Sequence, residues 1–169
     1  IPREEFFVVT KVWINNSGEE KAYASVKRSL KKLGTGYADL ILVHQPFGDY
    51  YGTYRALERA MEEGLTRAIG VSNFRPDRYY DLVQHCKITP MVNQLEANVL
   101  SQQTEIREVM KEYGTKVMAW GPVAQGKADI IENKALEELG KKYGKSAAQI
   151  GLRFLTQEGI AAIPKSSNP

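Results

Sequence analysis

Two residues of this sequence, Lys11 and His44, are of types that take part in acid–base chemistry, and both lie in or beside short apolar segments. Lys11 interrupts "FFVVTKV", where a buried lysine would be costly unless it is paired or functional. His44 ends the run "ADLILVH", and the only other histidine, His85, lies in the mixed segment "YYDLVQHCK". An edge position for Lys11 and a structural role for His44 stay open on residue type alone.

Three amides and hydroxyls fall at the ends of other apolar segments. Ser72 and Asn73 in "GVSNF" offer groups suited to a carboxamide, although a turn or a helix cap would also explain them. Gln94 in "VNQLE" needs hydrogen-bond partners, which a ligand or the surrounding core would supply.

Two further positions could contact a ligand. Trp120 could stack on an aromatic ring or pack in the core. Lys165 and Ser166 in "IPKSSNP" offer a cation and a hydroxyl for phosphate, with a solvated tail as the alternative. Each signal is weak alone, and the shared place at segment ends is what links them.

The segments that must position these residues alternate between β-branched runs and helical periodicity, the pattern of stacked βα units. Capping boxes at Ser17 with Glu20 and at Ser146 with Gln149, and Pro76 in a first turn, mark predicted helix starts. The predicted strands are residues Phe6–Val12, Ala38–His44, Thr66–Ser72, Met91–Glu96, Lys116–Trp120 and Gly159–Pro164.

Six βα units suit an open doubly wound sheet or part of a (β/α)₈ barrel. No strand is followed by a G-x-G-x-x-G turn. In a barrel the polar strand ends converge at one mouth, whereas an open sheet would spread them along an edge. The sequence therefore predicts an α/β chain forming part of a (β/α)₈ barrel, as a single domain over residues 1–169.

Composition narrows the classes of function. The 169 residues are 43% hydrophobic, and 23 basic against 20 acidic side chains show no basic stripe, which argues against nucleic acid as a partner. The single cysteine, Cys86, excludes an internal disulfide and a cysteine zinc cluster. No apolar run of membrane-spanning length and no signal-peptide pattern is present, so we expect no membrane partner and a cytoplasmic setting.

The segments "TKVW", "DLILVHQP", "GVSNF", "VNQLE", "AWGP" and "IPKS", in this order and at these intervals, resemble the aldo-keto reductases. This is a (β/α)₈ family that reduces carbonyls with NADPH, and the resemblance covers essentially the whole chain. The stretch from His44 to Phe74 is most similar to bacterial members that reduce diketo-gluconate, small dicarbonyls and aldehydes. The resemblance implies a small-molecule carbonyl substrate and a nicotinamide cofactor.

Matched motif by motif, the resemblance also implies roles for individual residues. Lys11 and His44 would be catalytic, and Asp39 would be structural. Ser72, Asn73 and Gln94 would hold the nicotinamide carboxamide, Trp120 would stack on its ring, and Lys165 and Ser166 would meet the adenosine phosphates. The remaining expected contacts are Gly121 and Pro122 with the cofactor, and Trp13, Gln45 and Phe47 with the carbonyl substrate.

The family's acid is a tyrosine, tuned by the lysine and an aspartate, that precedes the "TKVW" strand. We therefore expect the first two βα units and the C-terminal segment, with its arginine for the 2′-phosphate, to be absent from this chain. Tyr50 or Tyr51 as a substitute acid is disfavoured, because both are predicted to lie in a loop without a lysine partner. A non-catalytic nucleotide-binding or interaction module and a sugar-phosphate enzyme are the alternative functions.

Overall fold

The computed structural model describes residues 1–126 and 128–166, in which strands and helices alternate as predicted. Six strands form one sheet in the order β1-β2-β3-β4-β5-β6, and the pairs β1–β2, β2–β3 and β5–β6 are parallel. The strands are β1 (Val9–Val12), β2 (Ala38–Val43), β3 (Thr66–Ser72), β4 (Val92–Glu96), β5 (Lys116–Trp120) and β6 (Ala161–Ala162). The α-helices are α1 (Glu19–Leu33), α2 (Tyr50–Glu62), α3 (Pro76–Val83), α4 (Thr104–Glu112), α5 (Ala128–Ile131), α6 (Lys134–Tyr143) and α7 (Ala147–Gln157), with 3₁₀ turns at Arg3–Glu5, Ile14–Asn16 and Ala124–Gly126.

The strand boundaries follow the predictions most closely where a strand is flanked on both sides. β3 and β5 have the predicted limits, whereas β1 begins only at Val9 and β6 has only two residues. Phe6 and Phe7, predicted as strand, are 47% and 67% exposed and lie outside β1. An apolar run thus extends further than the hydrogen-bonded strand at both ends of the sheet.

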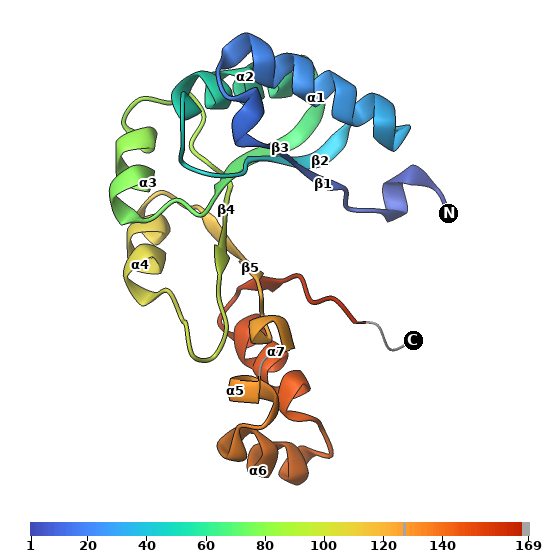
Figure 1. Ribbon diagram of the computed structural model, residues 1–169, viewed down its shortest axis with the longest axis vertical. Coiled ribbons are helices and arrows are strands. Elements are labelled where there is room, and N and C mark those ends of the chain that lie inside the picture. Colours follow the sequence, from blue (N-terminus) through green and yellow to red (C-terminus); the bar gives the residue numbers. More distant parts are fainter. Residues whose placement is uncertain (127, 167–169) are drawn as a thin grey trace. The chain divides into compact units, whose positions relative to one another are not determined.

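The chain divides into two compact units, residues 1–93 with 109–115 and residues 94–108 with 116–169. In the first unit, α1 and α2 pack against each other and cover one face of β1, β2 and β3 (Figure 1). All six residues of β2 are buried, as expected for a strand flanked by neighbours on both sides. The single-domain prediction stays a prediction.

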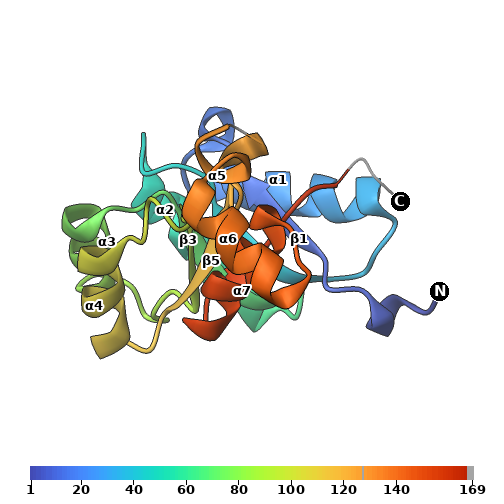
Figure 2. The same cartoon turned by 90° about the horizontal axis from the view of Figure 1, so that it is seen from below.

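In the second unit, α7 packs against α5, α6 and β6, and β6 pairs with β5. Figure 2 shows α6 and α7 side by side. α7 begins at the predicted capping box: the Ser146 hydroxyl accepts from Gln149 N at 3.2 Å, and Ser146 N donates to Gln149 Oε1 at 2.9 Å. Leu155 is fully buried on the same helix. The cap and the buried face together fix where this helix begins and which side packs.

The other predicted helix starts had different outcomes. Pro76 is the first residue of α3, as predicted. The capping box at Ser17 was wrong, because α1 begins at Glu19 after Gly18 and has no side-chain cap. Gly18 takes the capping position, Ser17 N donates to Ile14 O, and Ser17 Oγ has no hydrogen-bond partner among the described residues. No helix in the described part of the chain combines the length and the apolar character needed to cross a bilayer.

Candidate active site at the carboxyl ends of β1 to β3

Lys11 and His44 lie on neighbouring parallel strands, near the same end. The register pairs Lys11 with Leu42 and Val12 with Val43, and His44 N donates to Val12 O at 3.1 Å. His44 is therefore the first residue after β2, held by one further hydrogen bond of the same ladder. Both side chains are partly buried.

The electrostatics of the two groups are coupled. Burial lowers the pKa of the Lys11 ammonium. Burial also lowers the pKa of the His44 imidazole, and the positive charge of Lys11 lowers it further. Lys11 pairs with Leu42 in the parallel register and His44 follows Leu42 by two residues, so Lys11 and His44 are placed on the same face of the sheet. His44 is thereby held neutral near neutral pH, and a neutral imidazole can donate a hydrogen bond to a carbonyl oxygen.

Trp13 completes this group. It follows β1 and meets the His44 ring edge-to-face, with ring centroids 4.6 Å apart and an interplanar angle of 74°. Trp13 is 44% exposed, so one side of the indole packs on the histidine while the rest faces outward. Edge-to-face pairs of this kind restrict the orientation of both rings.

The end of β3 is tied to the end of β2 through Asn73. Its Nδ2 donates to His44 O at 3.3 Å and to Ser72 Oγ at 3.2 Å. Ser72 is fully buried, and Asn73 has a left-handed backbone with φ +62°. A hydroxyl beside a primary amide offers both donors and acceptors, which fits the donor and acceptor pair of a carboxamide.

Gln45 and Phe47 lie in the loop after His44. Phe47 N donates to Gln45 O at 2.9 Å, which makes a tight turn, and Phe47 is 61% exposed while Gln45 is partly buried. The predicted substrate residues Trp13, Gln45 and Phe47 therefore lie on the two loops that leave β1 and β2.

The other predicted cofactor residues lie in the second unit. Gln94 is 1% exposed, and its Nε2 contacts Met118 Sδ at 3.0 Å. Trp120 is partly buried and its carbonyl accepts from Ala97 N at 3.2 Å. Gly121 has φ +59°, which favours glycine because a side chain is strained there.

Pro122, Lys165 and Ser166 are the last of the predicted cofactor contacts. Pro122 is buried directly after Gly121. Lys165 and Ser166 are exposed and follow β6. A lysine ammonium and a serine hydroxyl are both groups that can donate hydrogen bonds to an anionic ligand.

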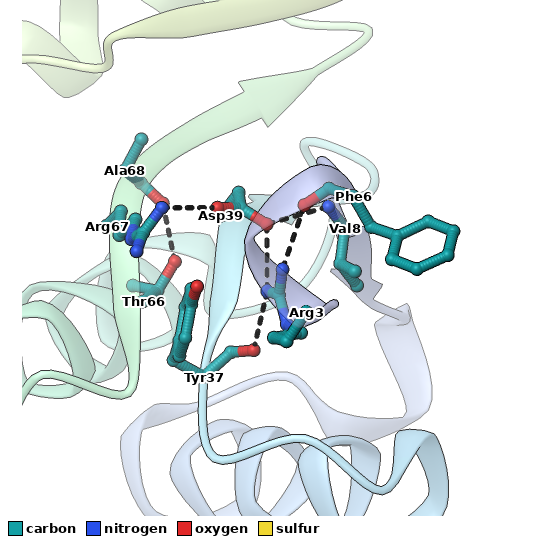
Figure 3. Close-up of polar contacts among 8 residues, drawn as sticks. All are labelled: Arg3, Phe6, Val8, Tyr37, Asp39, Thr66, Arg67 and Ala68. Carbon is teal, nitrogen blue, oxygen red and sulfur yellow. Dashed lines mark hydrogen bonds and ion pairs between the residues drawn. The ribbon is translucent and has the colours of Figure 1, made fainter. Parts of the chain in front are cut away.

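Asp39 lies near the amino end of β2, at the opposite end of the strand from His44. Its Oδ2 accepts from Val8 N and from Arg3 Nη2, each at 2.8 Å, and its Oδ1 accepts from Arg67 Nη1 at 3.2 Å (Figure 3). This network joins the segment before β1 to β2 and β3. The contacts support the interpretation of Asp39 as structural.

Tyr50 and Tyr51 are in the first turn of α2, so the prediction that they lie in a loop was wrong. Both phenols donate to Asp81 Oδ2, Tyr50 at 2.8 Å. The hydrogen bond to the Asp81 carboxylate, with one to Tyr50, raises the pKa of Tyr51 well above its ordinary value. A tyrosine held in this way is a poor proton donor, which agrees with the expectation that Tyr51 is not a substitute acid.

Sequence reasoning missed Asp49 and Thr53, which join the loops around His44. Asp49 caps α2 by accepting from Gly52 N at 2.7 Å, and an aspartate just before a helical stripe was a signal that could have identified it. Thr53, inside the helix, carried no such signal. Among the described residues, no group of three or more His, Cys, Asp or Glu is placed to hold a metal ion.

Comparison with known proteins decides the family. The model of the aldo/keto reductase family matches residues 1–169. This chain belongs to that family. It is 46% identical over 170 residues to 9,11-endoperoxide prostaglandin H2 reductase of Trypanosoma cruzi, covering 99% of this chain and 60% of that protein. It is 41% identical over 167 residues to glyoxal reductase of Bacillus subtilis, covering 98% and 60%.

Solved structures of aldo-keto reductases show the same fold. MGS-M4, an aldo-keto reductase from a Medee basin deep-sea metagenome library, matches with a TM-score of 0.97 and 40% identity, over 100% of this chain and 64% of that one. A Bombyx mori aldo-keto reductase in complex with NADP matches with a TM-score of 0.92 and 35% identity, over 99% and 61%. The predicted α/β fold, part of a (β/α)₈ barrel, is confirmed. This aldo-keto reductase chain spans about 60% of the length of the curated relatives that it matches.

Proposed function

We propose that this chain carries the lysine–histidine part of an NADPH-dependent carbonyl-reducing site, for aldehydes and ketones of the small dicarbonyl or keto-sugar type. The observation that carries the proposal is the placement of Lys11 and His44 at the same end of the neighbouring parallel strands β1 and β2, with Trp13 packed on the His44 ring. Glyoxal reductase among the relatives and an NADP complex among the structural neighbours support the substrate class and the cofactor. A cytoplasmic setting is part of the proposal.

The cofactor, when bound, supplies the hydride for the carbonyl carbon. In the proposed site the neutral His44 imidazole donates a hydrogen bond that orients the carbonyl oxygen, and the Lys11 ammonium stabilises the negative charge that grows on that oxygen. The family's tyrosine acid would supply the proton that this oxygen gains, so that hydride and proton together give the alcohol. Trp13, Gln45 and Phe47 line the space for the rest of the carbonyl molecule. Hydrogen bonds to developing charge accelerate reactions because they are stronger in the transition state than before it.

The proposed binding residues act on different parts of the cofactor. Ser72, Asn73 and Gln94 hold the carboxamide, and Trp120 stacks on the ring beside Gly121 and Pro122. Lys165 and Ser166 meet the phosphates. The buried position of Ser72 and Gln94 supports this assignment, since buried amides and hydroxyls give directional hydrogen bonds.

The test uses variants at Lys11 and His44 in the protein that carries this chain. His44→Gln and Lys11→Met should each lower kcat/KM for a small dicarbonyl by about 100-fold. NADPH affinity, measured by cofactor fluorescence, should change less than about threefold, since neither residue is assigned to cofactor contacts. His85→Gln and Lys116→Met replace the same residue types at exposed positions and should leave both quantities unchanged.

Three outcomes count against the proposal. Equal activity of His44→Gln and His85→Gln would show that His44 takes no part in the site. Cofactor binding without consumption of NADPH would support a non-catalytic nucleotide-binding module instead. Absence of NADPH binding would contradict both, and protection from proteolysis by phosphate alone would then support a sugar-phosphate enzyme.

A further inference from the structure

The loops that leave β1 and β2 are joined by a cluster of hydrogen bonds, which we name the clasp: Gly18, Asp49 and Thr53. Gly18 N donates to Asp49 O at 3.2 Å and to Thr53 Oγ1 at 3.0 Å. Thr53 Oγ1 in turn donates to Asp49 O at 2.8 Å, and Thr53 is 2% exposed. One buried hydroxyl therefore bonds to both loops, as acceptor to one and as donor to the other.

The Asp49 side chain fixes the clasp to the first turns of two helices. Asp49 Oδ1 accepts from Gly52 N at 2.7 Å. A Cβ at Gly52 would overlap Asp49 Oδ2 and would lie 3.0 Å from Glu19 N, so the carboxylate lies beside the start of α1 as well as α2. A negative charge near two helix amino termini is favourable, which holds the loops at a fixed place on the helices.

The two loops also approach too closely for a side chain between them. Gly48 has φ +66°, and a Cβ there would lie 2.7 Å from Ser17 Oγ. Ser17 Oγ is buried and has no hydrogen-bond partner among the described residues. Ser17 therefore lies close beside Gly48, and a side chain at position 48 would displace it.

The aromatic groups at the site lie on these same loops. Trp13 is at the start of the first loop and His44 is at the start of the second, and their ring centroids are 4.6 Å apart. Phe47, 61% exposed, stands next to Gly48 in the second loop. The clasp thus joins the loops at their far ends, while Trp13 and His44 meet at their near ends.

We propose that the Thr53 hydroxyl, acting through the clasp, is a positioning group that holds Trp13 against His44 and so sets the affinity of the pocket for aromatic carbonyl substrates. The proposal rests on the proposed function for its substrate, because it takes the His44 side of the loops as the carbonyl pocket. Thr53 touches neither Trp13 nor His44 in the hydrogen-bond network described, so its effect is indirect. An aromatic substrate should depend on the placement of Trp13 more than a small aliphatic one does.

The kinetic test compares Thr53→Val with two matched variants. Thr53→Val should raise KM for an aromatic aldehyde about fivefold relative to a small aliphatic dicarbonyl. Its kcat for the dicarbonyl should stay within about twofold, because Lys11 and His44 keep their strand contacts. Thr53→Ser, which keeps the hydroxyl, should restore the wild-type ratio. Thr35→Val removes a buried hydroxyl that has no hydrogen-bond partner in the described residues and should leave the ratio unchanged.

A second readout follows Trp13 directly and needs no turnover. In a Trp120→Phe background, Trp13 is the only tryptophan of the chain, and acrylamide should quench its fluorescence more strongly in Thr53→Val than in Thr53→Ser or Thr35→Val. Gly48→Ala serves as the alternative variant if Thr53→Val does not fold. It changes an exposed residue, pushes Ser17 away and should increase the quenching of Trp13 in the same way.

Unchanged quenching in both Thr53→Val and Gly48→Ala overturns the proposal, as does an unchanged KM ratio in a folded, active Thr53→Val. If NADPH-dependent reduction is absent in the wild type, the proposed function fails while the quenching result still decides whether the clasp holds Trp13. The two proposals are therefore separable.

Discussion

Replacement of the buried Asp39 carboxylate tests how the segment before β1 is attached to the sheet. Asp39 is 3% exposed, and three donors converge on it: Val8 N and Arg3 Nη2 on Oδ2, and Arg67 Nη1 on Oδ1 (Figure 3). The Arg3 side chain is 23% exposed and the Arg67 side chain is 61% exposed. Arg3 also donates to Phe6 O at 2.8 Å and to Tyr37 O at 3.0 Å, while Asp39 supplies the negative charge beside its guanidinium.

The loss in the free energy of unfolding caused by Asp39→Ala can be worked out from these exposed fractions. The pair with exposed Arg67 contributes at most about 1 kcal/mol, since solvent screens it. Loss of the carboxylate also leaves the partly buried Arg3 cation without its counter-charge and Val8 N without an acceptor, and breaking such a pair costs about 3–5 kcal/mol. We expect a loss of about 4 kcal/mol in the free energy of unfolding for Asp39→Ala, and about 2 kcal/mol for Asp39→Asn, which keeps an acceptor for Val8. Arg67→Ala should cost less than about 1 kcal/mol.

Urea unfolding at several pH values measures these differences. Burial alone would raise the pKa of Asp39, but the Val8 N–H, the hydrogen bond from Arg3 and the charges of Arg3 and Arg67 together hold it below its ordinary value of 3.8. Because the folded pKa is lowered, the carboxylate stabilises the fold above about pH 3.8 and this contribution disappears as the pH falls through the folded value. The gap between wild type and Asp39→Ala should therefore narrow only at strongly acidic pH. A cost for Asp39→Ala no larger than that for Arg67→Ala would refute the reasoning.

Substitutions at Glu58 and Gly70, each with a matched control variant, test contacts in the same unit by urea unfolding. Glu58 is 3% exposed, and its Oε1 accepts from the backbone N–H groups of residues 87–88 at 2.7 and 2.9 Å. Glu58→Ala should therefore lower the free energy of unfolding by about 3 kcal/mol, and Glu58→Gln, which keeps an acceptor, by about 1 kcal/mol. Equal losses for the two variants would contradict this account. A Cβ at Gly70 would overlap Val92 O, so Gly70→Ala should lower the free energy of unfolding by at least about 2 kcal/mol. Gly36→Ala is the control, because no atom lies within 4 Å of the new Cβ, and it should lower the free energy of unfolding by less than about 0.5 kcal/mol. Similar stabilities of the two alanine variants would show that β3 and β4 can separate to accept the methyl group.

The strands and helices were predictable to different degrees, because their limits depend both on neighbouring residues and on pairing with distant ones. β3 and β5 had the predicted limits, because their apolar residues lie between turn residues. Phe6 and Phe7 are apolar without being paired, and apolar character alone cannot tell a strand from an exposed edge segment. The Ser17 capping box has the right spacing but fails, because Ser17 N donates to Ile14 O and the helix begins one residue later, after Gly18.

The sequence by itself determined the alternation of strands and helices, the family motifs and the positions of Lys11 and His44 at strand ends. These properties depend on residues close together in the chain. The tertiary structure decided that Lys11 and His44 share one face of neighbouring strands, that Trp13 packs on the His44 ring, and that a buried threonine in α2 joins the two loops. Such contacts join residues about 30 or more positions apart, and only the parallel register of β1 and β2 brings them within reach of each other.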